Sequence, residues 1–302
     1  MDLKSKIVLI SGPTASGKSS LAIKLAKKIN GEIINADSMQ VYKELKILSA
    51  RPNPKDYKKI KHHLYGFHNV KFNFSTGDWI KLAIKKIKEI KRRKKIPIFV
   101  GGTGLYFKAL TDGLVNIPNI PIRSRNKIRL LHKNLGQKKF YQKLLKLDPN
   151  SKDKINPTDA QRTIRAFEVK QFTKKSLHDW FKNTKSYFVE DEFYKIYIDY
   201  SREDLILRIN QRTEQMFKMG AIKEVKRFIK LKIKKDKSVN KAIGINEIKE
   251  YLNDKKELGN IKEKISIKTR QYAKRQSTWA RGNMINWFKL QPQEMNKFLK
   301  KI

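Results

Sequence analysis

The apolar and polar positions of the first third of the chain predict strands and helices in alternation. The apolar run Ile7–Ser11 predicts a buried strand, and the sequence from Lys18 to about Lys28 predicts a helix. A short strand at Glu32–Asn35, a Lys-rich amphipathic helix over about Trp79–Lys94 and an apolar strand at Ile96–Val100 follow. Strands that alternate with helices indicate a parallel sheet with right-handed connections.

The pattern changes near Ile117. The segment NIPNIPIRSR (116–125) has the composition of a Pro-containing linker, and the chain from there to about Val189 predicts helices without alternating strands. FYKIYIDYS (193–201) predicts another strand, followed by helical segments to the end and a Lys-rich surface loop at 230–241. We therefore expect an α/β core, residues 1–117 and 193–302, interrupted by a helical insertion at 118–192.

Charge and composition narrow the class of protein. Lys and Arg number 70 against 28 Asp and Glu, a net charge of +42 over 302 residues, which favours a polyanionic partner such as a nucleic acid. A general Lys bias, accompanied by many Ile and Asn residues, is the alternative explanation. The chain contains no cysteine, which excludes disulfides and thiolate chemistry. The sequence has no apolar stretch of membrane-spanning length and no signal-like start, so we expect a cytoplasmic protein without a membrane partner. No feature of the sequence demands an oligomer, and we expect a monomer.

The segment GPTASGKSS (12–20) has the spacing of a phosphate-binding loop between a strand and a helix. Its backbone N–H groups are expected to surround a di- or triphosphate, helped by the helix dipole. Lys18 adds a positive charge, and Ser19 offers its hydroxyl to Mg²⁺. The fold is therefore expected to be P-loop NTPase-like. The predicted diphosphate-binding residues of this loop are Gly12, Pro13, Thr14, Ala15, Ser16, Gly17, Lys18 and Ser19.

Two further features follow predicted strands and should reach the same crevice, because ligands bind beyond the carboxyl ends of parallel strands. Asp37 ends the second strand, where it can hold magnesium, act as a base or cap a helix at Met39 and Gln40. The turn Gly101–Gly104 offers backbone groups and the Thr103 hydroxyl, although a plain strand–helix turn explains its glycines equally well.

Basic residues recur at helical spacing in three segments. Gln161, Arg162 and Arg165 share one helical turn, suited to base edges and phosphates or simply to a solvated face. Arg208 and Arg212 share a helix face and can grip a diphosphate or pair with nearby acids. The segment 268–282 interleaves basic residues with Tyr and Trp, which suits looped RNA. For the rings of Trp279 and Trp287 themselves, an ordinary core position is favoured. The pair His62–His63 has no metal-ligand company and is assigned a hydrogen-bonding role.

Together these segments resemble the tRNA dimethylallyltransferases, also called tRNA isopentenyltransferases. The matching stretches occur in family order along nearly the whole chain. They are GPTASGKSS (12–20), NADSMQVYKELKILSARP (35–52), HHL (62–64), PIFVGGTGLYFKAL (97–110), DAQRTIRAFEV (159–169), RINQR (208–212), AIGINEI (242–248) and TRQYAKRQSTWARG (269–282).

The resemblance implies transfer of a dimethylallyl group from dimethylallyl diphosphate to N6 of the adenosine at tRNA position 37, next to the anticodon. Lys18, the loop N–H groups, Mg²⁺ on Ser19 and Arg208 or Arg212 then stabilise the departing diphosphate. Asp37 accepts the N6 proton, and Thr103 helps to align the reacting groups. The insertion is implied to clamp the anticodon stem-loop of the tRNA.

The resemblance also implies a set of tRNA contacts. They are Asp37, Ser38, Met39, Gln40, Thr103, Arg125, Gln161, Arg162, Thr163, Ile164, Arg165, Lys274, Arg275, Gln276, Trp279 and Arg281.

Three positions depart from the family pattern. Ile245 stands where Tyr is usual, which puts a stacking contact in doubt, and Tyr65-Gly66 replaces Ile-Asp. Lys174 replaces a helix-ending glycine, at a cost of about 1 kcal/mol if its φ is positive. The alternatives to this function are a small-molecule or nucleoside kinase, a non-catalytic RNA-binding protein, and an isopentenyltransferase that acts on free adenine nucleotides.

Overall fold

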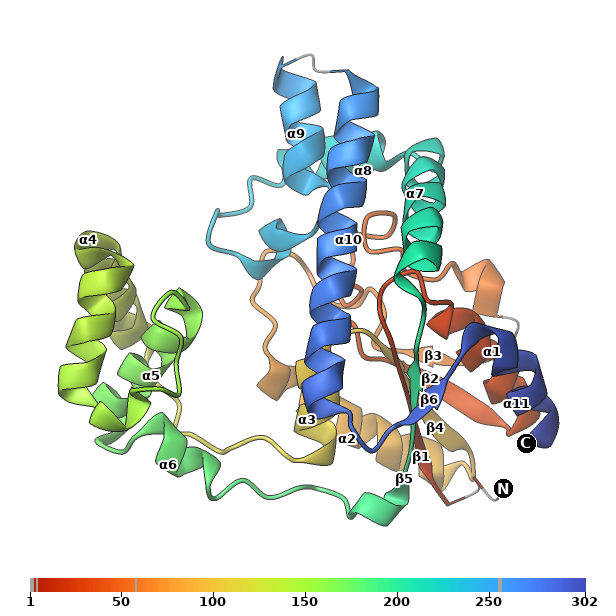
Figure 1. Cartoon of the computed structure of the whole chain (residues 1–302), viewed down its shortest axis with the longest axis horizontal. Coiled ribbons are helices and arrows are strands. Elements are labelled where there is room, and N and C mark those ends of the chain that lie inside the picture. Colours follow the sequence, from red (N-terminus) through yellow and green to blue (C-terminus); the bar gives the residue numbers. More distant parts are fainter. Residues whose placement is uncertain (1–2, 4, 58, 255–256) are drawn as a thin grey trace. The chain divides into compact units, whose positions relative to one another are not determined.

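The structure, a computed structural model, describes residues 3, 5–57, 59–254 and 257–302 (Figure 1). Six parallel strands form one sheet in the order β3-β2-β4-β1-β5-β6. The strands are β1 (Ile7–Ser11), β2 (Gly31–Asn35), β3 (His62–His63), β4 (Ile96–Gly101), β5 (Phe193–Ile198) and β6 (Phe288–Leu290). The predicted α/β class with a parallel sheet is confirmed.

The chain divides into two compact units, Met1–Thr111 with Phe188–Ile302, and Asp112–Tyr187. The first unit holds the sheet and the helices α1 (Lys18–Lys28), α2 (Thr76–Arg92), α3 (Gly104–Thr111), α7 (Arg202–Lys218), α8 (Ala221–Lys230), α9 (Ile245–Asp254), α10 (Leu258–Asn283) and α11 (Met295–Lys301). The second unit holds α4 (Ile122–Leu147), α5 (Ala160–Thr173) and α6 (Leu177–Phe181). The sequence predicted this insertion at 118–192, so both predicted boundaries lie a few residues closer to the C-terminus than the observed ones.

The central strand β1 is buried along its whole length, as expected of a parallel sheet covered on both faces. Val8 and Ile10 pack with Leu21 and Leu25 of α1 in one core cluster. Helix α2 begins at Thr76, three residues before the predicted start, because Ser75 and Asp78 form a capping box. The spacing Ser-x-x-Asp was the available signal for this boundary.

The loops after β1, β2 and β4 lie at one edge of the sheet, because these strands are parallel and adjacent in the order β2-β4-β1. This edge carries the phosphate-binding loop, Asp37 and the turn Gly101–Gly104, as the alternation of strands and helices predicts. The backbone N–H of Thr103 donates to the carbonyl of Ala36 at 3.2 Å, which ties the second loop to the third.

Two strands were not predicted from the sequence. The chain beyond residue 201 was expected to be helical, but Phe288–Leu290 adds strand β6 beside β5. Strand β3 is only two residues long. Such short strands carry no measurable periodicity, so their pairing depends on neighbours that are distant in sequence.

The second unit has its own apolar core, which includes Phe140, Leu144 and Phe167. Helix α5 ends at Lys174, whose φ of 61° lies in the left-handed region. The condition under which the sequence analysis assigned this position a cost, a positive φ, is therefore met. Among the described residues, no helix is both long enough and apolar enough to cross a membrane.

Candidate active site

The loop between β1 and α1 has two glycines that the geometry requires. A Cβ on Gly12 would lie 2.9 Å from the carbonyl oxygen of Ile198, so a larger residue would push β5 away. Gly17 caps α1 with a φ of 81°, a left-handed conformation that side chains rarely adopt. The loop therefore closes over the start of α1 with its N–H groups available to an anion.

Lys18 lies half-buried within this loop, and its Nζ donates to the carbonyl of Pro13 at 2.6 Å. Burial lowers its pKa to about 7, the positive charge of Arg212 adds to this lowering, and Asp37 opposes it. The ammonium is therefore short of negative charge. A bound diphosphate would supply it.

Helix α7 sends two arginines to the loop. Arg208 Nε donates to the carbonyl of Ala15 at 2.6 Å, and Arg212 Nη1 donates to Thr14 Oγ1 at 2.9 Å. The predicted i, i+4 pair thus meets the loop from a helix about 190 residues away in sequence. Burial lowers the pKa of Arg212, whereas the charge of Asp37 acts in the opposite direction.

Two serines of the loop differ in exposure. Ser16 is 1% exposed, and its hydroxyl has no hydrogen-bond partner among the described residues. An unpaired buried hydroxyl in an anion-binding loop is an observation in favour of a ligand at this place. Ser19 is exposed on the first turn of α1, where its hydroxyl is open to a metal ion held by phosphate.

Asp37 follows β2 and shapes its own turn. Its Oδ1 accepts the backbone N–H groups of Met39 at 2.8 Å and Gln40 at 3.3 Å. The chain at these two residues forms turns, so the expected helix cap is a turn instead. The second carboxylate oxygen has no hydrogen bond within the part of the chain that the structure describes, and this leaves it available for a proton.

The electrostatic surroundings of Asp37 come from several elements. Its charge affects the pKa values of Lys18 from the loop, Arg212 from α7 and Tyr272 from α10. The pKa of Tyr272 is raised, mainly by burial and further by Asp37. One carboxylate therefore faces the cations of the phosphate loop across a partly buried space.

Thr103 fixes the turn beside Asp37. Its hydroxyl oxygen accepts the backbone N–H of Ser38 at 2.9 Å, and the hydroxyl lies 3.3 Å from Ser38 Oγ. The threonine thus holds the residue next to Asp37, a contact that also suits its expected role in alignment.

Helix α10 joins two of the loops through Gln276. The amide oxygen accepts the backbone N–H of Thr14 at 2.8 Å, and the amide nitrogen donates to the carbonyl of Gly102 at 2.8 Å. One turn further along the helix, the ring of Trp279 lies against Gly104, where a Cβ would come within 2.3 Å of the ring. The family resemblance implied that both residues contact tRNA, and the sequence did not indicate that Gln276 connects two loops.

The other expected tRNA contacts on α10 are solvent-exposed. Lys274, Arg275 and Arg281 are exposed, and the guanidinium of Arg275 lies 5.9 Å from the ring centre of Tyr272. Trp287, for which the sequence favoured a core position, is 7% exposed and packs edge-on against Phe107.

In the second unit, three arginines lie close to a buried carboxylate. Glu168 is 1% exposed, and Arg125, Arg129 and Arg165 lie 3.5, 3.6 and 3.7 Å from its oxygens. Two of these arginines, Arg125 and Arg165, are among the expected tRNA contacts. Three guanidiniums around one carboxylate leave an excess of positive charge.

Not every residue of the expected motif Gln161–Arg165 reaches the surface. Gln161 and Arg162 are exposed, whereas Thr163 is 0% exposed and donates its hydroxyl to the carbonyl of Asp159. Ile164 packs against the apolar core of the unit. Direct contact of the Thr163 side chain with RNA does not fit this burial.

Glu224 is a supporting residue that the sequence did not suggest. It is 4% exposed, and its carboxylate accepts the backbone N–H groups of Lys46, Ile47 and Leu48 at 2.8 to 2.9 Å. These three residues belong to the segment that follows Asp37. Only a spatial contact between α8 and this segment identifies the role of Glu224.

The histidine pair and the departures from the family pattern have structural explanations. His63 Nε2 lies 2.7 Å from Glu32, and His62 Nδ1 lies 2.9 Å from the carbonyl of Ile60. Ile245 is 0% exposed within a core cluster, so it presents no surface for stacking. Gly66 has a φ of 55°, and a Cβ there would meet Arg51.

Across the described residues, no group of three or more His, Cys, Asp or Glu side chains could hold a metal ion.

The sheet, the loop and the carboxylate that faces it define a P-loop α/β protein that binds a phosphorylated compound beside a potential base. Residues 40–283 match the IPP transferase family. The chain belongs to this family of transferases, which decides against the kinase and the non-catalytic alternatives.

Several similar proteins match this chain over nearly its whole length. The tRNA dimethylallyltransferase of Pelagibacter ubique is 61% identical over 302 residues, which are 100% of this chain and 96% of the relative. A solved tRNA delta(2)-isopentenylpyrophosphate transferase from Staphylococcus epidermidis is 34% identical with a TM-score of 0.68, over 98% of this chain and 97% of the other. A eukaryotic dimethylallyltransferase acting on tRNA gives a TM-score of 0.82 at 29% identity, over 95% and 73% of the two chains.

Proposed function

We propose that this enzyme transfers a dimethylallyl group from dimethylallyl diphosphate to N6 of the adenosine at tRNA position 37, releasing diphosphate. The observation that carries the proposal is that Asp37 and the phosphate loop, which Lys18 and Arg212 contact, lie at the same edge of the sheet. A base and a cationic cradle for a leaving group are the two parts that an alkyl transfer to a weak nucleophile needs.

In the proposed reaction, the adenine N6 attacks C1 of the allyl group while the bond from C1 to the diphosphate oxygen breaks. Asp37 accepts the N6 proton at the carboxylate oxygen that the turn does not use. The hydrogen bonds from Met39 and Gln40 hold the carboxylate in one orientation. Thr103 supports this orientation through Ser38.

The departing diphosphate is bound by the residues Gly12–Ser19. Lys18, Arg208 and Arg212 neutralise its developing charge, and the unpaired hydroxyl of Ser16 gains a partner. Bound Mg²⁺ would supply further neutralisation of the diphosphate. Ser19 is the loop residue whose exposed hydroxyl suits this ion.

The tRNA contacts are assigned to two exposed basic surfaces. Lys274, Arg275 and Arg281 of α10 form one, and Gln161 with Arg162 of α5 forms the other. Glu168 orients Arg125 and Arg165 toward the same role, binding the anticodon stem-loop. We also propose that the enzyme acts as a monomer in the cytoplasm, the compartment of its tRNA substrate.

The test is the variant Asp37→Asn. An asparagine still accepts the N–H groups of Met39 and Gln40, so the turn is retained while the base is lost. We expect transfer to an anticodon stem-loop RNA, followed by the mass of the product, to slow by about 10²- to 10⁴-fold.

Binding of dimethylallyl diphosphate and of RNA should change little in the same variant. Full turnover in Asp37→Asn would mean that another group removes the proton. A wild-type product with no added five-carbon mass would reject the proposed reaction as a whole.

A further inference from the structure

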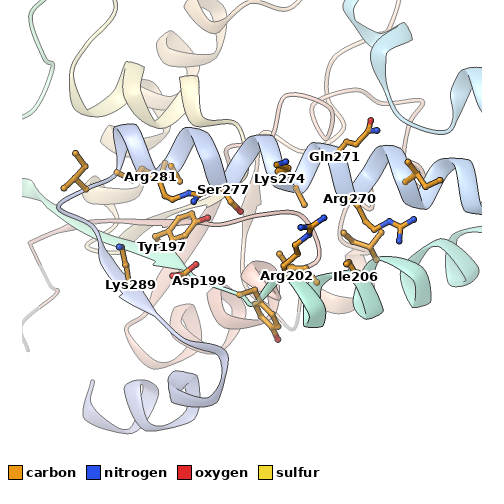
Figure 2. A pocket seen from close by; sticks show the side chains of 18 residues that line it. Tyr197, Asp199, Arg202, Ile206, Arg270, Gln271, Lys274, Ser277, Arg281 and Lys289 are labelled. Carbon is orange, nitrogen blue, oxygen red and sulfur yellow. The ribbon is translucent and has the colours of Figure 1, made fainter.

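A cavity lies between α7 and α10 (Figure 2). It measures about 810 Å³ and is bounded by α7, α10 and the chain around the ends of β5 and β6. This volume falls in the range of pockets that enclose drug-sized ligands. Of the residues that line the cavity, only Lys274 and Arg281 have a role in the proposed reaction, as tRNA contacts.

The cavity is separated from the phosphate loop by a thin apolar wall. Leu205 and Ile209 of α7 pack against Ala273 of α10, and Ala15 of the loop packs against the same cluster. Residues on one side of this wall, such as Arg212, contact the loop. Residues on the other side, such as Ile206, line the cavity.

The floor of the cavity is aliphatic. It is formed by Leu205, Ile206, Ile209, Ile267, Met284 and Ile285. Ile267 and Ile285 are 39% and 73% exposed, so apolar surface is left open to solvent here. An aliphatic chain that covered this surface would gain about 25 cal/mol for each Å² removed from water.

The rim of the cavity is cationic. It carries Arg202, Arg270, Lys274, Arg281 and Lys289 (Figure 2). Within the described residues, none of these five side chains has an ion pair, and Asp199 is the one carboxylate that lines the cavity. So many cations without anionic partners favour a ligand head with several negative charges, such as a diphosphate.

The aromatic rings of the cavity are already engaged. Tyr197 is 7% exposed and its hydroxyl is hydrogen-bonded to the side chain of Ser277. One face of the Tyr200 ring is covered by Arg208, 5.2 Å from its centre. Because RNA bases bind mainly by stacking on open rings, the cavity suits an aliphatic chain better than a base.

We propose that this cavity binds a prenyl diphosphate longer than the five-carbon substrate, with its chain on the aliphatic floor and its diphosphate at the cationic rim. The site is distinct from the phosphate loop. Its occupation is measured by binding, so the outcome is independent of whether transfer to tRNA occurs.

The experiment first saturates the loop with inorganic diphosphate and Mg²⁺ and then titrates monomeric farnesyl diphosphate by calorimetry. We expect one equivalent to bind, with an affinity that rises from geranyl to farnesyl diphosphate because the longer chain buries more apolar surface. Replacing the rim charges in Arg270→Glu/Lys289→Glu should weaken binding by at least about tenfold. Lys274 and Arg281 are left unchanged, since they are assigned to tRNA.

Matched variants separate the site from general charge. Ile285→Asp should also weaken farnesyl diphosphate, whereas Lys226→Glu, an exposed residue of α8, should not. The proposal is overturned if the double rim variant binds farnesyl diphosphate as tightly as the wild type, if Lys226→Glu has the same effect as the rim variant, or if only vesicles of anionic phospholipid bind. Rim variants that impair binding of stem-loop RNA while sparing farnesyl diphosphate would assign the rim to RNA and also overturn it.

Discussion

The ammonium of Lys18 is withdrawn from water, and its charged neighbours do not make up for that loss. Burial and Arg212 lower its pKa to about 7, although Asp37 partly offsets them. A diphosphate bound in the loop stabilises the ammonium and therefore raises this pKa. Ligand binding and protonation of Lys18 are thus linked.

The linkage predicts how the affinity for dimethylallyl diphosphate depends on pH. The protonated lysine is fully present below the free-state pKa of about 7, and binding above it requires uptake of a proton. We expect the dissociation constant to rise by up to about tenfold for each pH unit above 7, until the pKa of the bound state is reached. Calorimetry between about pH 7 and pH 9 in buffers of different ionisation enthalpy measures both the constant and the proton uptake.

The variant Lys18→Arg provides the matched control. Because arginine keeps its charge throughout this range, the dissociation constant of the variant should be independent of pH, whatever its absolute value. Equal slopes for the two proteins would assign the pH dependence to another group.

A residue outside the site tests backbone strain. Lys174 ends α5 with a φ of 61°, where a Cβ is unfavourable. We expect Lys174→Gly to raise the free energy of unfolding of the second unit by about 1 kcal/mol, measured by urea denaturation. Lys174→Ala removes the same charge and retains the Cβ, so it should not stabilise. A gain in both variants would point to charge repulsion instead.

At the scale of elements, the apolar runs were enough to predict β1, β2, β4, β5 and the helix after the phosphate loop. The strands β1, β2 and β4 are buried along their whole length, which favours apolar residues in them. The strands β3 and β6 were not predictable, since two and three residues carry no period and gain their hydrogen bonds from distant neighbours. The sequence predicted which loops lie at the carboxyl edge of the sheet, but not the side-chain contacts that support them.

The long helix α10 illustrates that difference. Its basic and aromatic residues suggested an RNA surface, and Lys274 and Arg281 are indeed exposed. Gln276, in the same stretch, instead bonds two loops that lie 262 and 174 residues away in sequence. No local pattern distinguishes an amide that bridges loops from one that faces RNA, because the difference lies in the partners.

The bridge predicts a defined effect of Gln276→Leu. The change leaves the N–H of Thr14 and the carbonyl of Gly102 without their partner, which costs about 1 to 3 kcal/mol for each buried group. We expect lower thermal stability and a higher KM for dimethylallyl diphosphate, with tRNA affinity nearly unchanged.

Gln276→Glu keeps the acceptor for Thr14 but loses the donor to Gly102, so its effect should be intermediate. Loss of tRNA affinity at unchanged stability would instead return Gln276 to the role of an RNA contact.

At the scale of the whole molecule, the net charge of +42 does not by itself locate the RNA. Exposed lysines occur on helices far from the catalytic edge, for instance Lys226 on α8 and Lys81 on α2. A uniform surplus attracts RNA from any side and gives no orientation. Orientation requires that particular cations neutralise particular phosphates.

The dependence of tRNA affinity on salt separates the two contributions. Each phosphate neutralised in the complex releases condensed counterions and adds about 0.7 to 0.9 to the slope of log affinity against log salt. Lys274→Gln and Arg281→Gln should therefore each lower the slope by about this amount, whereas Lys226→Gln should leave it unchanged. Filter binding of an anticodon stem-loop at several salt concentrations measures the slopes.

If all three variants shift the slope equally, the charge acts as a diffuse field and α10 is not the docking surface. If only the two α10 variants lower the slope, α10 binds the RNA. The same helix connects the phosphate loop to the turn at Gly102, so it would hold the RNA in a fixed position relative to the reacting groups.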